Sequence, residues 1–186
     1  MMPSPGTMLA LNQSSARSWL GSNAIHEAAD VLVRLADYQP ARVVIDGLEY
    51  REGLNAVAIA GGVAGNVIPD ECTVTVNYRF APSLTTDLAI AHVQAIFEGF
   101  DVRVVDVAPG ALPGLSQPAA ETFLGVTNST PRPKFGWTDV SRFTALGIPA
   151  VNYGPGEVAQ AHQVTESVPI ENLETVFDVL RRFLTS

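Results

Sequence analysis

The stretch Glu71–Phe80, ECTVTVNYRF, decides the fold prediction. Its apolar residues are Cys72, Val74, Val76, Tyr78 and Phe80, and they alternate with Thr73, Thr75, Asn77 and Arg79. A period of two residues is typical of a strand that packs one face and exposes the other, as in an antiparallel sheet. Pro82 ends the strand, because proline lacks the amide proton that a strand ladder needs.

The segments on either side of this strand are predicted to complete a single unit. Strands are predicted at residues 7–12, 41–46, 54–60 and 101–107, and helices at 24–39 and 84–97. Although these ranges contain one strand more than that plan, we interpret the order as β-α-β-β-α-β, the split βαβ or ferredoxin-like plan, in which the helices cover one face of an antiparallel sheet. The unit is bounded at residues 7–108, and the fold class is α+β.

Local signals define the ends and faces of these elements. Ser22 or Asn23 is predicted to cap the first helix and Ser83 the second, because their side-chain oxygens accept amide protons. In the strand that precedes the glycine-rich turn, Val57 and Ile59 are expected on one face. The apolar stripe of the first helix is Ile25, Ala28, Ala29, Leu32 and Ala36.

The second half of the chain follows a linker rich in Pro and Gly, APGALPGLS at 108–116. Helices are predicted at residues 118–126, 138–146 and 170–184, and one strand at 150–153. The inward face of the last helix is predicted to carry Leu173, Val176, Phe177, Leu180 and Phe183. Three helices with so little sheet cannot bury their apolar faces, so residues 117–186 indicate an incomplete α/β domain.

Composition and charge exclude several classes of partner and compartment. The net charge is -8 and the pI is about 4.7, so nucleic acid and anionic membranes are not expected partners. No apolar run reaches the length needed to span a bilayer, and the start has no signal-peptide pattern. The single cysteine, Cys72, excludes an intramolecular disulfide and fits the reducing cytoplasm.

Few side chains are candidates for chemistry. His26 and His92 lie in predicted helices without ligand spacing and are interpreted as structural or solvated. His162 follows a strand and a Gly-rich turn, so it is either a metal ligand or a solvated loop residue. Arg79 is either a carboxylate-binding fork or a surface charge. Asn66 either donates its amide to a substrate carbonyl or serves only its own turn.

Four motifs in order carry a family resemblance: SARSWLGSNAIH, GGVAGNVIPDECTVTVNYRFAP, FGWTDVSRFTALGIPAVNYGPGE and AHQVTESVPIENL. Together they resemble the succinyl-diaminopimelate desuccinylase family of the di-zinc aminoacylase and carboxypeptidase superfamily. The resemblance covers nearly all of residues 15–186. It implies a ferredoxin-like dimerisation domain, forming a homodimer through residues 7–108, inserted into a di-zinc hydrolase domain of which residues 117–186 are the C-terminal part.

The resemblance also implies a reaction and a set of site residues. Family members hydrolyse N-succinyl-LL-2,6-diaminopimelate to succinate and LL-2,6-diaminopimelate, in lysine biosynthesis. The residues implied to contact the substrate, an N-succinyl amino acid, are Asn66, Arg79, Arg17, Thr138 and Gly154. His162 matches the last histidine ligand of one of two zinc ions.

Departures from the family pattern limit these implications. The family carries an H-x-D motif, a bridging aspartate and a Glu-Glu pair, and the present sequence has no H-x-D and no Glu-Glu. The missing glutamates include the base that activates the metal-bound water. Ser14 stands where the family has a histidine that polarises the scissile carbonyl. We therefore predict a shortened form with no catalytic residue of its own, at most weak zinc binding and no hydrolysis by this chain alone.

Three other functions remain open. The first is a non-catalytic dimerisation module, and the second is a hydrolase of another N-acyl amino acid or dipeptide. A regulatory domain for a small molecule, suggested only by analogy with other ferredoxin-like folds, is the third.

Overall fold

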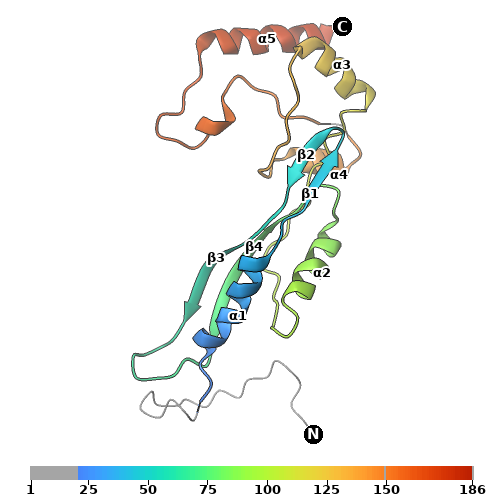
Figure 1. The fold of residues 1–186 in the computed structure, drawn as a ribbon. Coiled ribbons are helices and arrows are strands. Elements are labelled where there is room, and N and C mark those ends of the chain that lie inside the picture. Colours follow the sequence, from blue (N-terminus) through green and yellow to red (C-terminus); the bar gives the residue numbers. More distant parts are fainter. Residues whose placement is uncertain (1–20, 149, 186) are drawn as a thin grey trace. The chain divides into compact units, whose positions relative to one another are not determined.

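A computed structural model describes residues 21–148 and 150–185, and the chain separates into two compact units (Figure 1). The first unit comprises the described residues up to Val43 together with Arg51–Gly110, and the second comprises Val44–Tyr50 and the chain from Ala111 onward. The strand predicted at 7–12 and the candidate Arg17 lie outside the described residues.

Within the described residues, the sheet of the first unit is an antiparallel pair, β3 (Gly53–Gly61) and β4 (Cys72–Arg79). The pairing runs from Gly53 opposite Arg79 to Gly61 opposite Cys72, which confirms the strand predicted from the alternating stretch. A bulge between Ala56 and Ala58 leaves Val57 as an extra residue. The prediction that Val57 and Ile59 share a face assumed unbroken alternation, which the bulge interrupts between them, and both side chains are exposed.

Two helices follow the predicted positions in this unit, α1 (Ala24–Asp37) and α2 (Thr86–Ile96). Asn23 caps α1, because its side-chain oxygen accepts from the amides of Ile25 and His26 at 3.0 and 3.3 Å. Thr85, rather than the predicted Ser83, caps α2 by accepting from the Leu88 amide. Ser83 is instead part of the turn that the bond from Leu84 N–H to Ala81 O closes at 2.9 Å.

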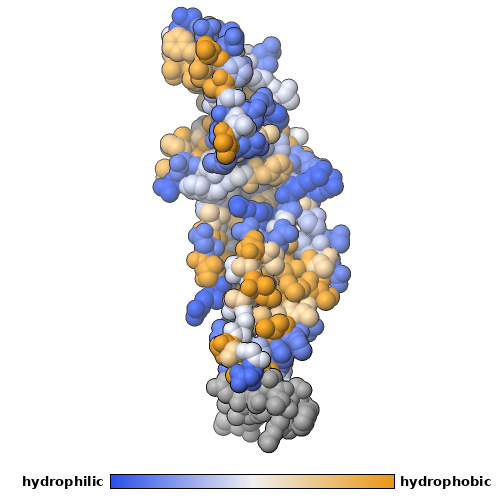
Figure 2. Space-filling view, turned by 90° about the vertical axis from the view of Figure 1, so that its left-hand side faces the viewer, coloured by the Kyte–Doolittle hydropathy of each residue, from blue (hydrophilic) through white to orange (hydrophobic). Residues whose placement is uncertain are grey.

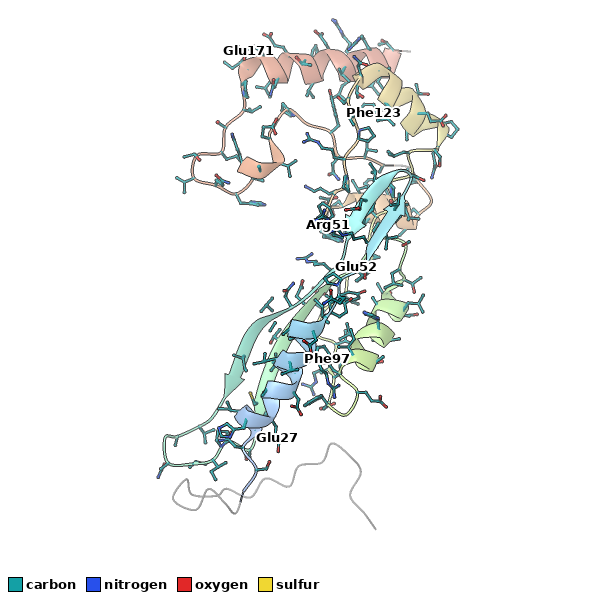
Figure 3. All side chains as sticks on the ribbon, viewed as in Figure 1. Glu27, Arg51, Glu52, Phe97, Phe123 and Glu171 are labelled. Carbon is teal, nitrogen blue, oxygen red and sulfur yellow. The ribbon has the colours of Figure 1, made fainter. Side chains whose placement is uncertain are left out.

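The core of the first unit forms around three buried side chains, Val31 of α1, Leu54 of β3 and Phe97 after α2 (Figure 3). The half-buried apolar residues packed against them are Leu35, Tyr38, Val74, Val76, Tyr78, Val93, Ile96, Phe100 and Val102. The stripe predicted for α1 is partly wrong, since Ile25 and Leu32 are each 42% exposed. α1 carries two adjacent apolar stripes, and the packed one contains Ala24, Ala28 and Val31.

A single arginine joins the two helices of this unit. Arg34 of α1 donates from Nη1 to the carbonyl oxygens of Ile96 and Glu98, at 2.8 and 2.9 Å. Its guanidinium also lies 5.1 Å from the centre of the Phe100 ring. The last turn of α2 contains no basic residue, so Arg34 supplies the positive charge that favours a helix C-terminus.

Two expected features of the sheet differ from the prediction. The segment 101–107 has no strand in the part of the chain that the structure describes. A strand exists only where a ladder forms, and the split βαβ plan gives this segment the strand predicted at 7–12 as its neighbour. The strand predicted at 41–46 is half of a separate hairpin, β1 (Arg42–Ile45) and β2 (Leu48–Arg51), with Asp46 and Gly47 at positive φ between them.

The described residues of the second unit form four helical elements: α3 (Pro118–Thr127), α4 (Val140–Ala145), the short 3-10 helix η2 (Val158–Gln160) and α5 (Ile170–Thr185). Phe123 of α3 joins α3 to α5, because its ring lies 5.0 Å from that of Phe183 and 5.2 Å from that of Tyr153 (Figure 3). The predicted helices are confirmed. The strand predicted at 150–153 is wrong, because these residues have no regular structure and no partner strand within the described range.

The apolar faces of the second unit are largely uncovered. Val179 is the only residue of α5 that is buried within the described part, whereas Phe177 is 63% exposed. Apolar surface is visible over α5 (Figure 2, top). Leu173, Phe177 and Leu180 are therefore not inward-facing as predicted, and the expectation of unburied faces is confirmed. None of the described helices combines the length and apolarity needed to cross a membrane.

The chain passes so close to Pro82 at Gly110 that a side chain would not fit there. A Cβ at Gly110 would lie 2.6 Å from Cα of Pro82, whereas a Cβ at Gly125 in α3 would meet nothing within 4 Å. We expect Gly110→Ala to lower the free energy of unfolding by about 1–3 kcal/mol, as overpacking does. Gly125→Ala is the matched control and should raise it by about 0.5–1 kcal/mol, since alanine favours a helix interior. Urea unfolding of both variants measures the difference, and equal effects would contradict the close approach.

Candidate functional site

Arg79 presents a free cation at the end of β4. Its side chain is on the polar face, and its Cα lies opposite Gly53 in the ladder. Within the described residues the guanidinium donates no hydrogen bond and forms no ion pair. An exposed, unneutralised guanidinium beside a glycine leaves space for a planar carboxylate.

Asn66 lies at the opposite end of the same hairpin. It occupies the loop from Gly62 to Glu71, within the turn that the bond from Val67 N–H to Ala64 O closes at 3.2 Å, and it is exposed. The eight residues of β4 separate the loop from Arg79 by about 23 Å at the usual strand rise. An extended tripeptide spans only about 10 Å. The hairpin therefore does not bring Asn66 and Arg79 to one small ligand within one chain.

Thr138 and Gly154 lie close to each other in the second unit. Thr138 Oγ1 accepts from the side-chain amide of Asn152 at 3.1 Å, which fastens the segment before α4 to the segment that contains Gly154. Asn172 of α5 donates to the carbonyl oxygen of Pro155 at 3.0 Å, which holds the next residue of the loop. Gly154 is exposed, and a Cβ there would meet nothing within 4 Å.

His162 follows η2 in a tight turn with a φ of 67°. Its backbone N–H donates to Glu166 Oε2 at 2.9 Å, so the turn fixes the main chain of this residue and leaves the imidazole exposed. Among the described residues no three His, Cys, Asp or Glu side chains come together as metal ligands. One imidazole is too few for a catalytic zinc, so the described residues do not by themselves fit that ion.

A hydrogen-bonded cluster that the sequence prediction did not include lies beneath Arg79. Glu52, between β2 and β3, accepts from Tyr78 O–H through Oε2 and from Ala81 N–H through Oε1, both at 2.9 Å (Figure 3). The ring of His92 stacks on Tyr78 with centres 5.2 Å apart, and its Nε2 lies 3.0 Å from Tyr38 Oη. The signal in the sequence was Tyr78 itself, since a buried tyrosine hydroxyl usually needs a polar partner.

The electrostatics of this cluster keep the Tyr78 hydroxyl protonated. Burial, and after it the hydrogen bond to Glu52, raise the pKa of Tyr78 far above its ordinary value near 10. The hydroxyl is therefore always available as the donor to the Glu52 carboxylate. The interpretation of His92 as structural agrees with its two ring contacts.

Comparison with known proteins assigns the first unit to a family. The sequence model of the family described as peptidase dimerisation domain matches residues 12–104. This match agrees with the α+β class and with the antiparallel pair β3–β4 beneath two helices.

Full-length relatives are similar over both units. A protein of Mycobacterium tuberculosis H37Rv described as a putative succinyl-diaminopimelate desuccinylase is 58% identical over 172 residues, which cover 91% of this chain and 49% of that protein. The succinyl-diaminopimelate desuccinylase of Corynebacterium glutamicum is 46% identical over 92% of this chain and 48% of its own length. An acetylornithine deacetylase of Myxococcus xanthus is 29% identical over 87% of this chain. The resemblance seen in the sequence motifs is confirmed, and the chain spans about half the length of the curated relatives it matches.

The hydroxyl of Tyr78 gives a pH test of the cluster. Its pKa is raised on folding, so the folded state holds this proton more tightly than the unfolded state. The stabilisation is complete below about pH 10, the ordinary tyrosine pKa, and is lost as the pH rises above it. We expect the free energy of unfolding to fall less steeply above pH 10 in Tyr78→Phe than in the wild type. Urea unfolding between pH 8 and pH 11 measures both slopes, and identical slopes would contradict the cluster.

Proposed function

The chain belongs to the peptidase dimerisation domain family, and on that premise we propose that it is the dimerising, substrate-contacting part of a succinyl-diaminopimelate desuccinylase. The proposal assigns residues 7–108 to the dimerisation domain and residues 117–186 to the catalytic domain. The reaction is hydrolysis of N-succinyl-LL-2,6-diaminopimelate to succinate and LL-2,6-diaminopimelate, in the cytoplasm.

The surface of the first unit supports self-association. The second stripe of α1 contains Ile25, Ala29, Leu32 and Ala36, all exposed. β3 lies nearby with one edge unpaired among the described residues, and the bulge residue Val57 is exposed. Figure 2 shows apolar surface on this unit (lower half). An exposed apolar stripe beside a free strand edge is typical of an interface between two copies.

The separation of Asn66 and Arg79 carries the functional proposal. One small substrate cannot reach both ends of β4 in a single chain, whereas two copies can each supply one end. Arg79 provides a fork for a substrate carboxylate, and Asn66 provides an amide donor for a carbonyl. Thr138 and Gly154 contribute from two segments of the second unit, which the hydrogen bond from Asn152 to Thr138 holds together.

Hydrolysis needs groups beyond those of this chain. His162 is proposed as one zinc ligand, and the full sequence contains neither an H-x-D nor a Glu-Glu motif. The proposed activity of this chain alone is therefore binding without turnover, and no step of the reaction is assigned to a metal held by the described residues. Because one relative is named an acetylornithine deacetylase, another N-acyl amino acid is the second candidate substrate.

Dimerisation is tested with a charge placed in the second stripe of α1. We expect the 19.7 kDa chain to sediment as a dimer at micromolar concentration and Leu32→Glu to sediment as a monomer. The matched control is Leu88→Glu on α2, which is also exposed and should remain dimeric. A wild-type monomer, or dimers in both variants, would overturn the assignment of this surface.

Substrate contact is tested by calorimetry with N-succinyl-LL-2,6-diaminopimelate. We expect the wild-type chain to bind this ligand in preference to LL-2,6-diaminopimelate. Arg79→Gln should weaken binding by about tenfold or more, since a hydrogen bond to a charged group contributes about 1.5–3 kcal/mol. Arg103→Gln, an exposed arginine of the same unit, is the control. Equal binding of both ligands, or no effect of Arg79→Gln, would contradict the substrate assignment.

A further inference from the structure

The residues on either side of Arg79 are held by one carboxylate. Glu52 Oε2 accepts from the hydroxyl of Tyr78, which precedes Arg79, and Oε1 accepts from the amide of Ala81, two residues after it. Both oxygens of Glu52 are thus engaged at 2.9 Å, and both contacts lie within the first unit. Hydrogen bonds to an ionised acceptor are stronger than those between neutral groups.

Glu52 itself is fixed on the opposite strand. Its backbone N–H donates to Ala41 O at 3.0 Å, and the next residue, Gly53, pairs with Arg79 in the ladder. Glu52 therefore fastens the end of β4, and the residues just after it, to the start of β3. Without it, the end of the strand would be held by the ladder alone, and ladder ends fray easily.

The geometry separates the clamp from the cation. Side chains alternate along β4, so Tyr78 lies on the packed face and Arg79 on the exposed face. Glu52 uses its oxygens on Tyr78 and Ala81 and forms no ion pair with Arg79 among the described contacts. The backbone on both sides of Arg79 is thus held by Glu52, while the charge of the Arg79 guanidinium is left for a ligand.

Aromatic packing completes the support. His92 of α2 stacks on the Tyr78 ring at an interplanar angle of 29°, and Tyr38 at the end of α1 bonds to the same imidazole. Phe80 also lies beside this ring, with its ring centre 5.7 Å from that of Tyr78. Both helices thus restrain the ring whose hydroxyl meets Glu52.

We propose that Glu52 is a positioning residue for Arg79, which fixes the backbone of β4 so that the guanidinium meets a substrate carboxylate without being neutralised. The proposal rests on the proposed function for the ligand, but not for the clamp. The Glu52 carboxylate acts through the geometry of its hydrogen bonds. An uncharged side chain of the same length that can accept a hydrogen bond should therefore preserve the role of Glu52.

The test compares Glu52→Ala, Glu52→Gln and the control Glu71→Ala in the full chain. Glu71 is exposed next to the other end of β4. By NMR, we expect Glu52→Ala to speed exchange of the Ala81 amide about tenfold and to lower the backbone order of Arg79. Binding of N-succinyl-LL-2,6-diaminopimelate should weaken about three- to tenfold, less than the loss of a whole hydrogen bond to a charged group, because the guanidinium of Arg79 is still present. Glu52→Gln should restore binding to within about twofold, because its amide oxygen still accepts from Ala81 and its amide can donate to the Tyr78 hydroxyl oxygen.

The alternative outcomes are distinct. Unchanged order at Arg79 in Glu52→Ala would overturn the proposal, and so would Glu52→Gln binding as weakly as Glu52→Ala. If Glu52→Ala does not fold, Glu52→Asp replaces it, since the shorter side chain cannot reach both donors and should loosen the Ala81 amide. If the wild type binds no ligand yet Arg79 loses order in Glu52→Ala, the positioning role stands and the substrate assignment fails.

Discussion

The pairing of β3 with β4 determines on which side of the first unit each group lies. Gly53 opposite Arg79 and Gly61 opposite Cys72 fix the register, and the bulge at Val57 realigns it once. From that register follow the packed face, with Leu54 beneath the helices, and the polar face, with Arg79 in water. A one-residue slip would exchange the two faces, so the clamp, the core and the candidate ligand surface all depend on the same ladder.

This narrow sheet also explains why the surface of α1 remains apolar. Among the described residues, two strands offer one face of limited width, and Ala28 and Val31 of α1 are buried. The adjacent stripe, which contains Ile25 and Leu32, is only partly covered by the described residues of its own unit: Ile25 lies beside Gly61, and both side chains remain 42% exposed. The need to cover this stripe and the separation of Asn66 from Arg79 both favour a second copy, and the two arguments are independent. One concerns apolar area and the other concerns the reach of a small molecule.

Sequence patterns predicted the elements whose signals are local and missed those that depend on pairing. The alternation at residues 71–80, the Asn23 cap and the three C-terminal helices need only short-range information, and all are present. The strands predicted at 101–107 and 150–153 need a neighbour and have none in the described chain. The bulge at Val57 could not be predicted, because the order of residue types in a strand does not reveal that one residue has no partner on the neighbouring strand. The Asp46-Gly47 turn did carry a hairpin signal that the prediction overlooked. For the site, the candidates came from family motifs, while Glu52 joins residues 26 and 29 positions away and needed the structure.

The Arg34 contact has a consequence for how the chain tolerates change. Its guanidinium binds main-chain oxygens of Ile96 and Glu98, and those oxygens are present whatever side chains the two positions carry. Substitutions at 96 and 98 therefore leave the donor–acceptor pairs intact. An inserted or deleted residue near the end of α2 would instead move the carbonyls away from Arg34. The contact between the two helices thus tolerates substitutions at these positions but does not tolerate insertions or deletions.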